Sequence, residues 1–119
     1  MINVDSFLDR VPGPQYKCFD FVREVWAESF AVDLGDQLQG LAAALDDRHV
    51  VLSELRGFRK LLVPSDPCFV IFQRRRSTPH IGIWYQGNVL HLQGGQSAQY
   101  SRLKDVALRY TRTTFYEHR

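Results

Sequence analysis

Three side chains capable of nucleophilic and acid–base chemistry stand out in the chain: Cys18, His80 and His91. Cys18 begins a segment with helical periodicity, and the two histidines lie in consecutive segments with strand-like alternation. A thiol becomes a strong nucleophile near neutral pH only when a base takes its proton, and that base needs a partner to orient it. One cysteine and two histidines on adjacent elements can fill all three roles.

In a catalytic interpretation, Cys18 is the nucleophile at the first turn of a helix. The free N–H groups and partial positive charge at a helix N-terminus favour a thiolate and can hold the oxyanion of a tetrahedral intermediate. Lys17 beside it adds positive charge. His80 is then the general base that takes the thiol proton and later protonates a leaving amine, and His91 holds the His80 ring in the required tautomer.

Each of these residues also has a simpler interpretation. A cysteine on an apolar helix face is most often a core residue, and a single strand histidine more often packs than reacts. A zinc site built from Cys18, His80 and His91 is conceivable, although no local spacing motif supports one. His49 and His118 lie in loop or terminal settings and receive no role.

The elements that must position the three residues follow from hydrophobic periodicity. Helices are predicted at 2–10 (short), at 18–30 and at 37–45, the last with Asp36 as N-cap. The apolar stripe of the helix predicted at 18–30 contains Cys18, Val22, Val25, Trp26 and Ser29. Strands are predicted at 68–73, 80–85, 89–93 and 112–117, with a helical spacing between Leu103 and Tyr110. Residues 49–63 fit neither pattern well.

The order of helices first and an antiparallel sheet after them predicts an α+β fold in a single domain spanning residues 1–119. The hairpin between the histidine-bearing strands leaves a geometric question. With residues 86–88 as the turn, the position opposite His80 falls near residues 93–94, and His91 lies nearer to Ile83. Contact between the two rings therefore requires a diagonal reach, a bulge or a shifted register.

Composition limits the function classes. The 119 residues are 45% hydrophobic, include 8 Phe, 5 Tyr and 2 Trp, and carry a net charge of +2, which argues for a globular core and against nucleic-acid binding. The run Arg74-Arg75-Arg76 is interpreted as a solvated basic loop or, alternatively, a contact for an anionic polymer or partner protein. Cys68 is expected to be a buried apolar residue, and a disulfide with Cys18 is possible.

The N-terminus has no basic segment followed by an apolar one, and no apolar run reaches 18 residues. We therefore expect synthesis in a cytoplasm without a signal peptide, and no membrane insertion.

Together these segments resemble the NlpC/P60 superfamily of cell-wall cysteine peptidases over most of the chain. Residues 16–26 (YKCFDFVREVW) resemble the nucleophile helix, in the form found in bacteriophage tail proteins, where an aromatic residue stands two places before the cysteine. Residues 64–72 resemble the Pro-x-Gly-Asp segment and first strand, residues 80–85 and 87–91 resemble the His-Val-Gly-Ile hairpin, and residues 112–119 resemble the ending of phage tail members.

The resemblance implies a papain-like fold and hydrolysis of amide bonds in peptidoglycan stem peptides, typically next to D-glutamate, with no metal or organic cofactor. It carries over Cys18 as nucleophile, His80 as base and His91 as orienting residue. Cysteine precedes histidine here, unlike in the circularly permuted retinol-acyltransferase-like branch. The implied partners are stem peptides and other tail-tip or baseplate proteins, and the implied location is the virion tail.

The residues flanking Cys18 depart from the family pattern. The family usually has Asp before the cysteine and a small pair after it, whereas this chain has Lys17, Phe19 and Asp20; these positions and Tyr16 are the expected substrate-binding residues. Ser65 replaces the Gly of the Gly-Asp pair. The departures leave a second hypothesis open, a catalytically weak or inactive structural protein of the phage tail tip.

Overall fold

The computed structural model describes residues 1–46, 54–55 and 57–118. Its helices are the 3₁₀ helix η1 (Val4–Phe7), α1 (Cys18–Phe30), α2 (Gly35–Asp46) and α3 (Leu103–Ala107). Its strands are β1 (Glu54–Leu55), β2 (Phe58–Leu61), β3 (Cys68–Gln73), β4 (His80–Tyr85), β5 (Asn88–His91), β6 (Gln99–Ser101) and β7 (Arg112–His118).

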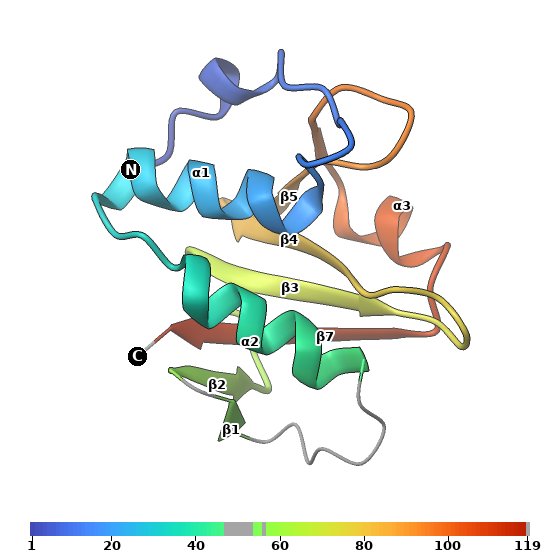
Figure 1. Ribbon diagram of the computed structural model, residues 1–119. Helices are drawn as coiled ribbons and strands as arrows, with labels where there is room; N and C mark the ends of the chain where they lie inside the picture. Colours follow the sequence, from blue (N-terminus) through green and yellow to red (C-terminus); the bar gives the residue numbers. More distant parts are fainter. Residues whose placement is uncertain (47–53, 56, 119) are drawn as a thin grey trace.

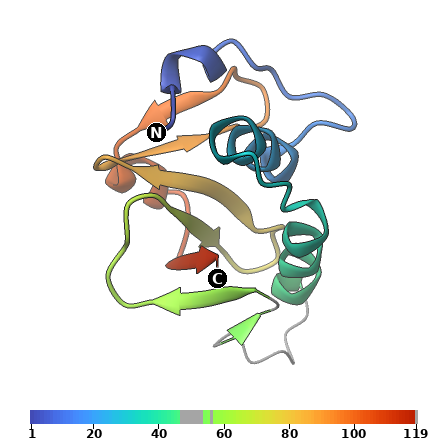
Figure 2. The ribbon, with the colours of Figure 1, turned by 90° about the vertical axis from the view of Figure 1, so that its left-hand side faces the viewer.

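The strands form one antiparallel sheet in the order β1-β2-β7-β3-β4-β5-β6. Helices α1 and α2 lie side by side over one face of this sheet (Figures 1 and 2). Helix α3 packs on the opposite face through Val106, which joins Val70, Phe72 and Val89 in a second apolar cluster. The predicted α+β class and the antiparallel sheet are therefore confirmed.

The larger core lies between α1, α2 and one face of the sheet; with the smaller cluster on the other face, it explains why β3 is apolar on both faces. Phe21, Val22 and Val25 of α1 are fully buried there. They meet Phe69, Ile71, Ile81, Ile83 and Tyr116 from the sheet. The alternation of β4 thus points Ile81 and Ile83 toward the helices and His80 toward the face that carries α3.

Helix α1 begins at Cys18 and ends at Phe30, as the sequence predicts. Lys17 has extended backbone torsions, and its N–H donates to Asp20 Oδ2 at 3.0 Å, which stops the helix from extending backward. The chain that enters the helix is held as well, because Tyr16 Oη and Arg10 Nε both donate to Glu24 Oε1 at 2.7 Å. These contacts fix the position of the first helical turn.

Several predicted boundaries are wrong. The leading helix is a single 3₁₀ turn, and α2 begins at Gly35. Asp36 lies in the first turn of α2 and is not its N-cap, because the helix already begins with the bond from Leu38 N–H to the Leu34 carbonyl at 2.8 Å. Asp33 Oδ1 accepts the Gly35 N–H at 2.9 Å. Strand β6 has no counterpart in the predictions. Of the segment 49–63, residues 49–53 and 56 lie outside the described residues, and β2 occupies 58–61.

The β4–β5 hairpin answers the register question. Its turn is the pair Gln86–Gly87, both with positive φ (49° and 87°), so that Tyr85 pairs with Asn88. Such a two-residue turn matches the twist of the flanking strands. Gly82 consequently pairs with His91, which places His91 diagonally across from His80 on the same face.

Position 82 has no room for a side chain, so a glycine is required there. A Cβ atom there would lie 2.6 Å from Val89 Cγ1 and 3.2 Å from His91 Cβ. The bare backbone at this position leaves room for the His91 side chain to cross the strand toward His80.

We expect Gly82→Ala to lower the free energy of unfolding by roughly 1–3 kcal/mol, the usual cost of overpacking a filled interior. Urea unfolding measures it. Gly40→Ala in α2 is the control, because nothing lies within 4 Å of the added methyl group and alanine favours a helix. Equal stability of Gly82→Ala and wild type would contradict the close approach of β4 and β5.

Candidate active site

The two histidines form a hydrogen-bonded pair that continues to a third side chain. His80 Nε2 lies 3.0 Å from His91 Nδ1, and His91 Nε2 lies 3.1 Å from Ser101 Oγ. His91 is 1% exposed and His80 6%. The structure therefore brings together the predicted base and the predicted orienting residue by the diagonal reach that the register requires.

His80 lies among aromatic rings. Its ring stacks on Phe72, its partner across β3 and β4, at 5.8 Å between centroids, and on Tyr110 at 6.0 Å. Burial, together with the electrostatic effects of His91 and Arg109, lowers the pKa of His80 to about 3. Because its Nε2 is bonded to His91, Nδ1 is the nitrogen left for a substrate or a thiol.

His91 is neutral at physiological pH for the same reason. Burial, together with the positive charge of Arg109, lowers its pKa to about 4. A neutral imidazole has one N–H donor and one bare acceptor nitrogen. In the His80–His91 hydrogen bond, one ring must donate and the other must accept. The direction of that bond therefore determines which nitrogen of each ring carries the proton.

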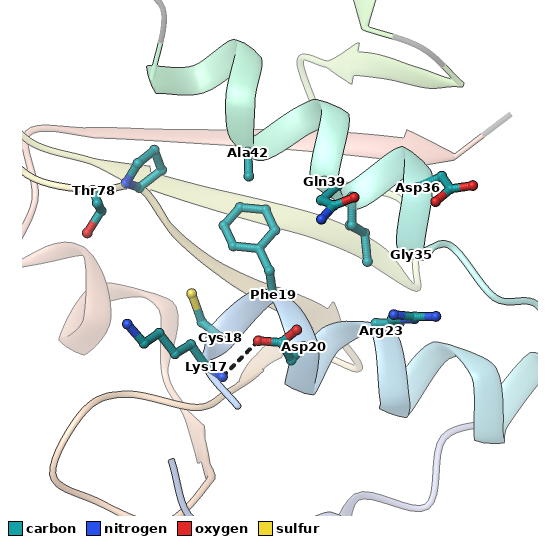
Figure 3. Close-up of a pocket in the computed structure, with 12 residues that line it drawn as sticks. Lys17, Cys18, Phe19, Asp20, Arg23, Gly35, Asp36, Gln39, Ala42 and Thr78 are labelled. Atoms are coloured by element: carbon teal, nitrogen blue, oxygen red, sulfur yellow. Dashed lines mark hydrogen bonds between the residues drawn. The ribbon is translucent and has the colours of Figure 1, made fainter. Parts of the chain in front are cut away.

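Cys18 lies where two cavities meet. One, of about 400 Å³, extends between the start of α1 and α2 (Figure 3). The other, of about 520 Å³, extends toward the start of β4 and includes His80 and Tyr110 in its wall. Both cavities are lined by Cys18, Lys17, Thr78 and Pro79. An extended substrate lying across Cys18 could therefore occupy both sides of the thiol.

The thiol of Cys18 is not held as a thiolate at rest. Burial raises its pKa above the ordinary 9.0, and the nearby Asp20 carboxylate raises it further. Hydrogen bonds from the backbone N–H groups of Ile81, Phe19 and Cys18 itself oppose this rise without overcoming it. The N–H groups at the helix N-terminus thus favour a thiolate as expected, but burial outweighs them, and the thiol and both imidazoles are neutral in the resting protein.

The predicted substrate-binding residues separate into two groups. Lys17, Phe19 and Asp20 line the cavity between α1 and α2. Figure 3 shows the Lys17 side chain extending away from the Asp20 carboxylate. Tyr16 lines neither of the cavities that meet at Cys18, because its hydroxyl is bonded to Glu24. It fixes the turn that leads into α1.

Sequence reasoning missed two residues of the site. Ser101 lies on β6, a strand too short and too polar for its alternation to be recognised. Tyr110 follows α3, and only its helical spacing to Val106 drew attention to it. Among the remaining predictions, Cys68 is buried as expected at 1% exposure, and it and Cys18 are both free thiols.

Within the described part of the chain, no three His, Cys, Asp or Glu side chains lie in a group that could hold a metal ion. No helix in that part has the length and apolar character needed to cross a bilayer. Comparison of the chain with protein-family models, with curated proteins and with solved structures finds no match.

A neutral resting thiol predicts a particular pH dependence of alkylation. The rate of Cys18 modification by iodoacetamide should be low at pH 6 and rise with a single ionisation above about pH 9. Peptide mass spectrometry resolves Cys18 from Cys68, and Cys18→Ala identifies the signal. A rate plateau between about pH 5 and 7, as a thiolate–imidazolium pair gives, would contradict a neutral resting site.

The buried histidine pair predicts that stability is lost in acid. Its folded pKa values lie below the ordinary 6.5, so the unfolded chain binds protons that the folded chain does not as pH falls from 6.5 toward about 4. The free energy of unfolding should fall across that window and be constant just above it. Urea unfolding of His91→Asn should show a shallower dependence. If the free energy of unfolding depended on pH equally in the variant and the wild type, the loss of stability in acid could not be assigned to the histidine pair.

Proposed function

We propose that this chain is a cysteine peptidase of the NlpC/P60 type that hydrolyses amide bonds in peptidoglycan stem peptides. The observation that carries the proposal is that His80, which is paired with the buried His91 at 3.0 Å, lines the same cavity as Cys18. Residues 62 positions apart in sequence thus share one cavity, in the order and on the elements that the resemblance to this superfamily implies. The papain-like fold belongs to the same proposal.

In the proposed reaction, the Cys18 thiol and the His80 imidazole are both neutral at the start. As the Cys18 sulfur attacks the substrate carbonyl carbon, its proton passes to His80 Nδ1, and the carbonyl oxygen becomes an oxyanion. The N–H groups of the first turn of α1 have no intrahelical acceptor, because the first intrahelical bond is made by Phe21 N–H, to the Lys17 carbonyl at 2.9 Å. Those of Cys18 and Phe19 bond to the sulfur at rest and would turn to the oxyanion once the sulfur has bonded to the carbonyl carbon.

In the second half of the reaction, His80 gives up the proton that it took from Cys18. His80 donates it to the leaving nitrogen as the C–N bond breaks, which leaves a thioester on Cys18 and a free amine. A water molecule then attacks the thioester, gives one proton to His80 and releases the carboxylic acid, and the proton on His80 restores the thiol. His91 keeps the His80 ring oriented throughout, since it accepts from the imidazolium Nε2–H.

A structural role in a phage tail tip is the second candidate. The neutral Cys18 thiol and the exposed run Arg74-Arg75-Arg76 favour it. Arg74 lies over the Tyr110 ring at 5.8 Å, so the loop is anchored beside the candidate site. Under either function we propose a location in the virion tail, with other tail-tip or baseplate proteins as partners.

Hydrolysis of purified stem peptides, followed by mass spectrometry of the products, separates the two candidates. The peptidase function predicts new amine and carboxyl ends from the wild type. Cys18→Ala should lower kcat/KM by at least roughly 10³-fold, since the nucleophile and its base act as a unit. Cys68→Ala, which removes the other thiol, should act near the wild-type rate. No cleavage by the wild type would reject the peptidase function in favour of the structural one.

A further inference from the structure

The hydrogen-bonded chain from His80 runs across three neighbouring strands on one face of the sheet. His91 pairs with Gln99, and Val89 pairs with Ser101, so Ser101 stands diagonally from His91 just as His91 stands diagonally from His80. The two steps measure 3.0 and 3.1 Å. Ser101 lines neither of the cavities that meet at Cys18, and any effect it has on a reaction must pass through His91.

Two proton arrangements satisfy these contacts. In the first, His80 Nε2–H donates to His91 Nδ1 and His91 Nε2–H donates to Ser101 Oγ, which leaves His80 Nδ1 bare. In the second, Ser101 Oγ–H donates to His91 Nε2, His91 Nδ1–H donates to His80 Nε2, and His80 Nδ1 carries a proton. Only the first arrangement leaves a nitrogen that can accept the Cys18 proton.

We propose that Ser101 is a positioning residue, whose hydroxyl accepts from His91 Nε2–H and thereby keeps Nδ1 of His80 free to act as the base. One observation favours this direction: Ser101 is only partly buried, which leaves its own O–H free to point to water. The catalytic consequence rests on the proposed peptidase function, whereas the tautomer does not.

Removal of the Ser101 hydroxyl should reverse the direction of the hydrogen bond between His80 and His91. His91 Nε2–H would then be a buried donor without an acceptor, which costs more than an unfilled acceptor nitrogen. The second arrangement would become the favoured one, with both rings protonated on Nδ1. His80 would lose its function as a base although every residue of the candidate trio remained.

The matched pair Ser101→Val and Ser101→Thr isolates the hydroxyl. Valine and threonine have the same shape, and both suit a strand; valine also fills the space that a water molecule could otherwise enter. Long-range ¹H–¹⁵N NMR of the imidazoles reports which nitrogen carries the proton. Spectra of His80→Gln and His91→Gln assign the signals, and circular dichroism of both Ser101 variants checks the fold.

We expect Nε2–H on both rings in the wild type and in Ser101→Thr, and Nδ1–H on both in folded Ser101→Val. Stem-peptide kcat should fall roughly 10²-fold in Ser101→Val with KM unchanged, the lower end of what a general base contributes, and should recover in Ser101→Thr. Nδ1–H in the wild type, or the same tautomers in the two variants, would overturn the proposal. If the wild type showed the expected tautomers but did not cleave stem peptides, the peptidase function would be rejected and the role of Ser101 in setting the tautomer would stand.

Discussion

The hydrogen bond between His80 Nε2 and His91 Nδ1 is the contact around which the site is built. Two buried imidazoles this close cannot both be charged, since two positive charges would repel each other in a poorly hydrated interior, and burial keeps each of them neutral near pH 7. Their approach depends on backbone features that look incidental in the sequence: a two-residue turn that fixes the strand register, and the bare backbone of Gly82 opposite His91. Any shift of register by one residue would send the two rings to opposite faces of the sheet.

The same burial governs Cys18. Its position at the start of α1 brings backbone N–H groups to the sulfur, yet the apolar surroundings and Asp20 keep the thiol protonated. The helix N-terminus is therefore better suited to stabilise charge that develops on a substrate oxygen than to store charge on the resting sulfur. Under the proposed peptidase function, such a site has little reactivity toward chance electrophiles and depends on a bound carbonyl group to draw the proton toward His80.

Periodicity predicted the elements that carry the site, because the apolar stripe of α1 and the alternation of β3 and β4 are long and regular. Both ends of α1, β3 and β4 match the predicted ends. The sequence offered a diagonal reach, a bulge or a shifted register for the two histidines but could not decide among them, since the choice depends on whether the turn has two residues or three. Ser101 was missed because a three-residue polar strand carries no periodic signal. The direction of the Cys18 pKa was misjudged because burial depends on packing from β4, which is 62 residues away.

The most direct test of the account is the scalar coupling between ¹⁵N nuclei across the His80–His91 hydrogen bond. In protein labelled with ¹⁵N at histidine, the account predicts a measurable coupling between His80 Nε2 and His91 Nδ1 at pH 7, lost in His91→Gln. It also predicts that both rings remain neutral down to about pH 5, because their pKa values lie near 3 and 4. Absence of coupling, together with independent titration of each ring near pH 6.5, would contradict it.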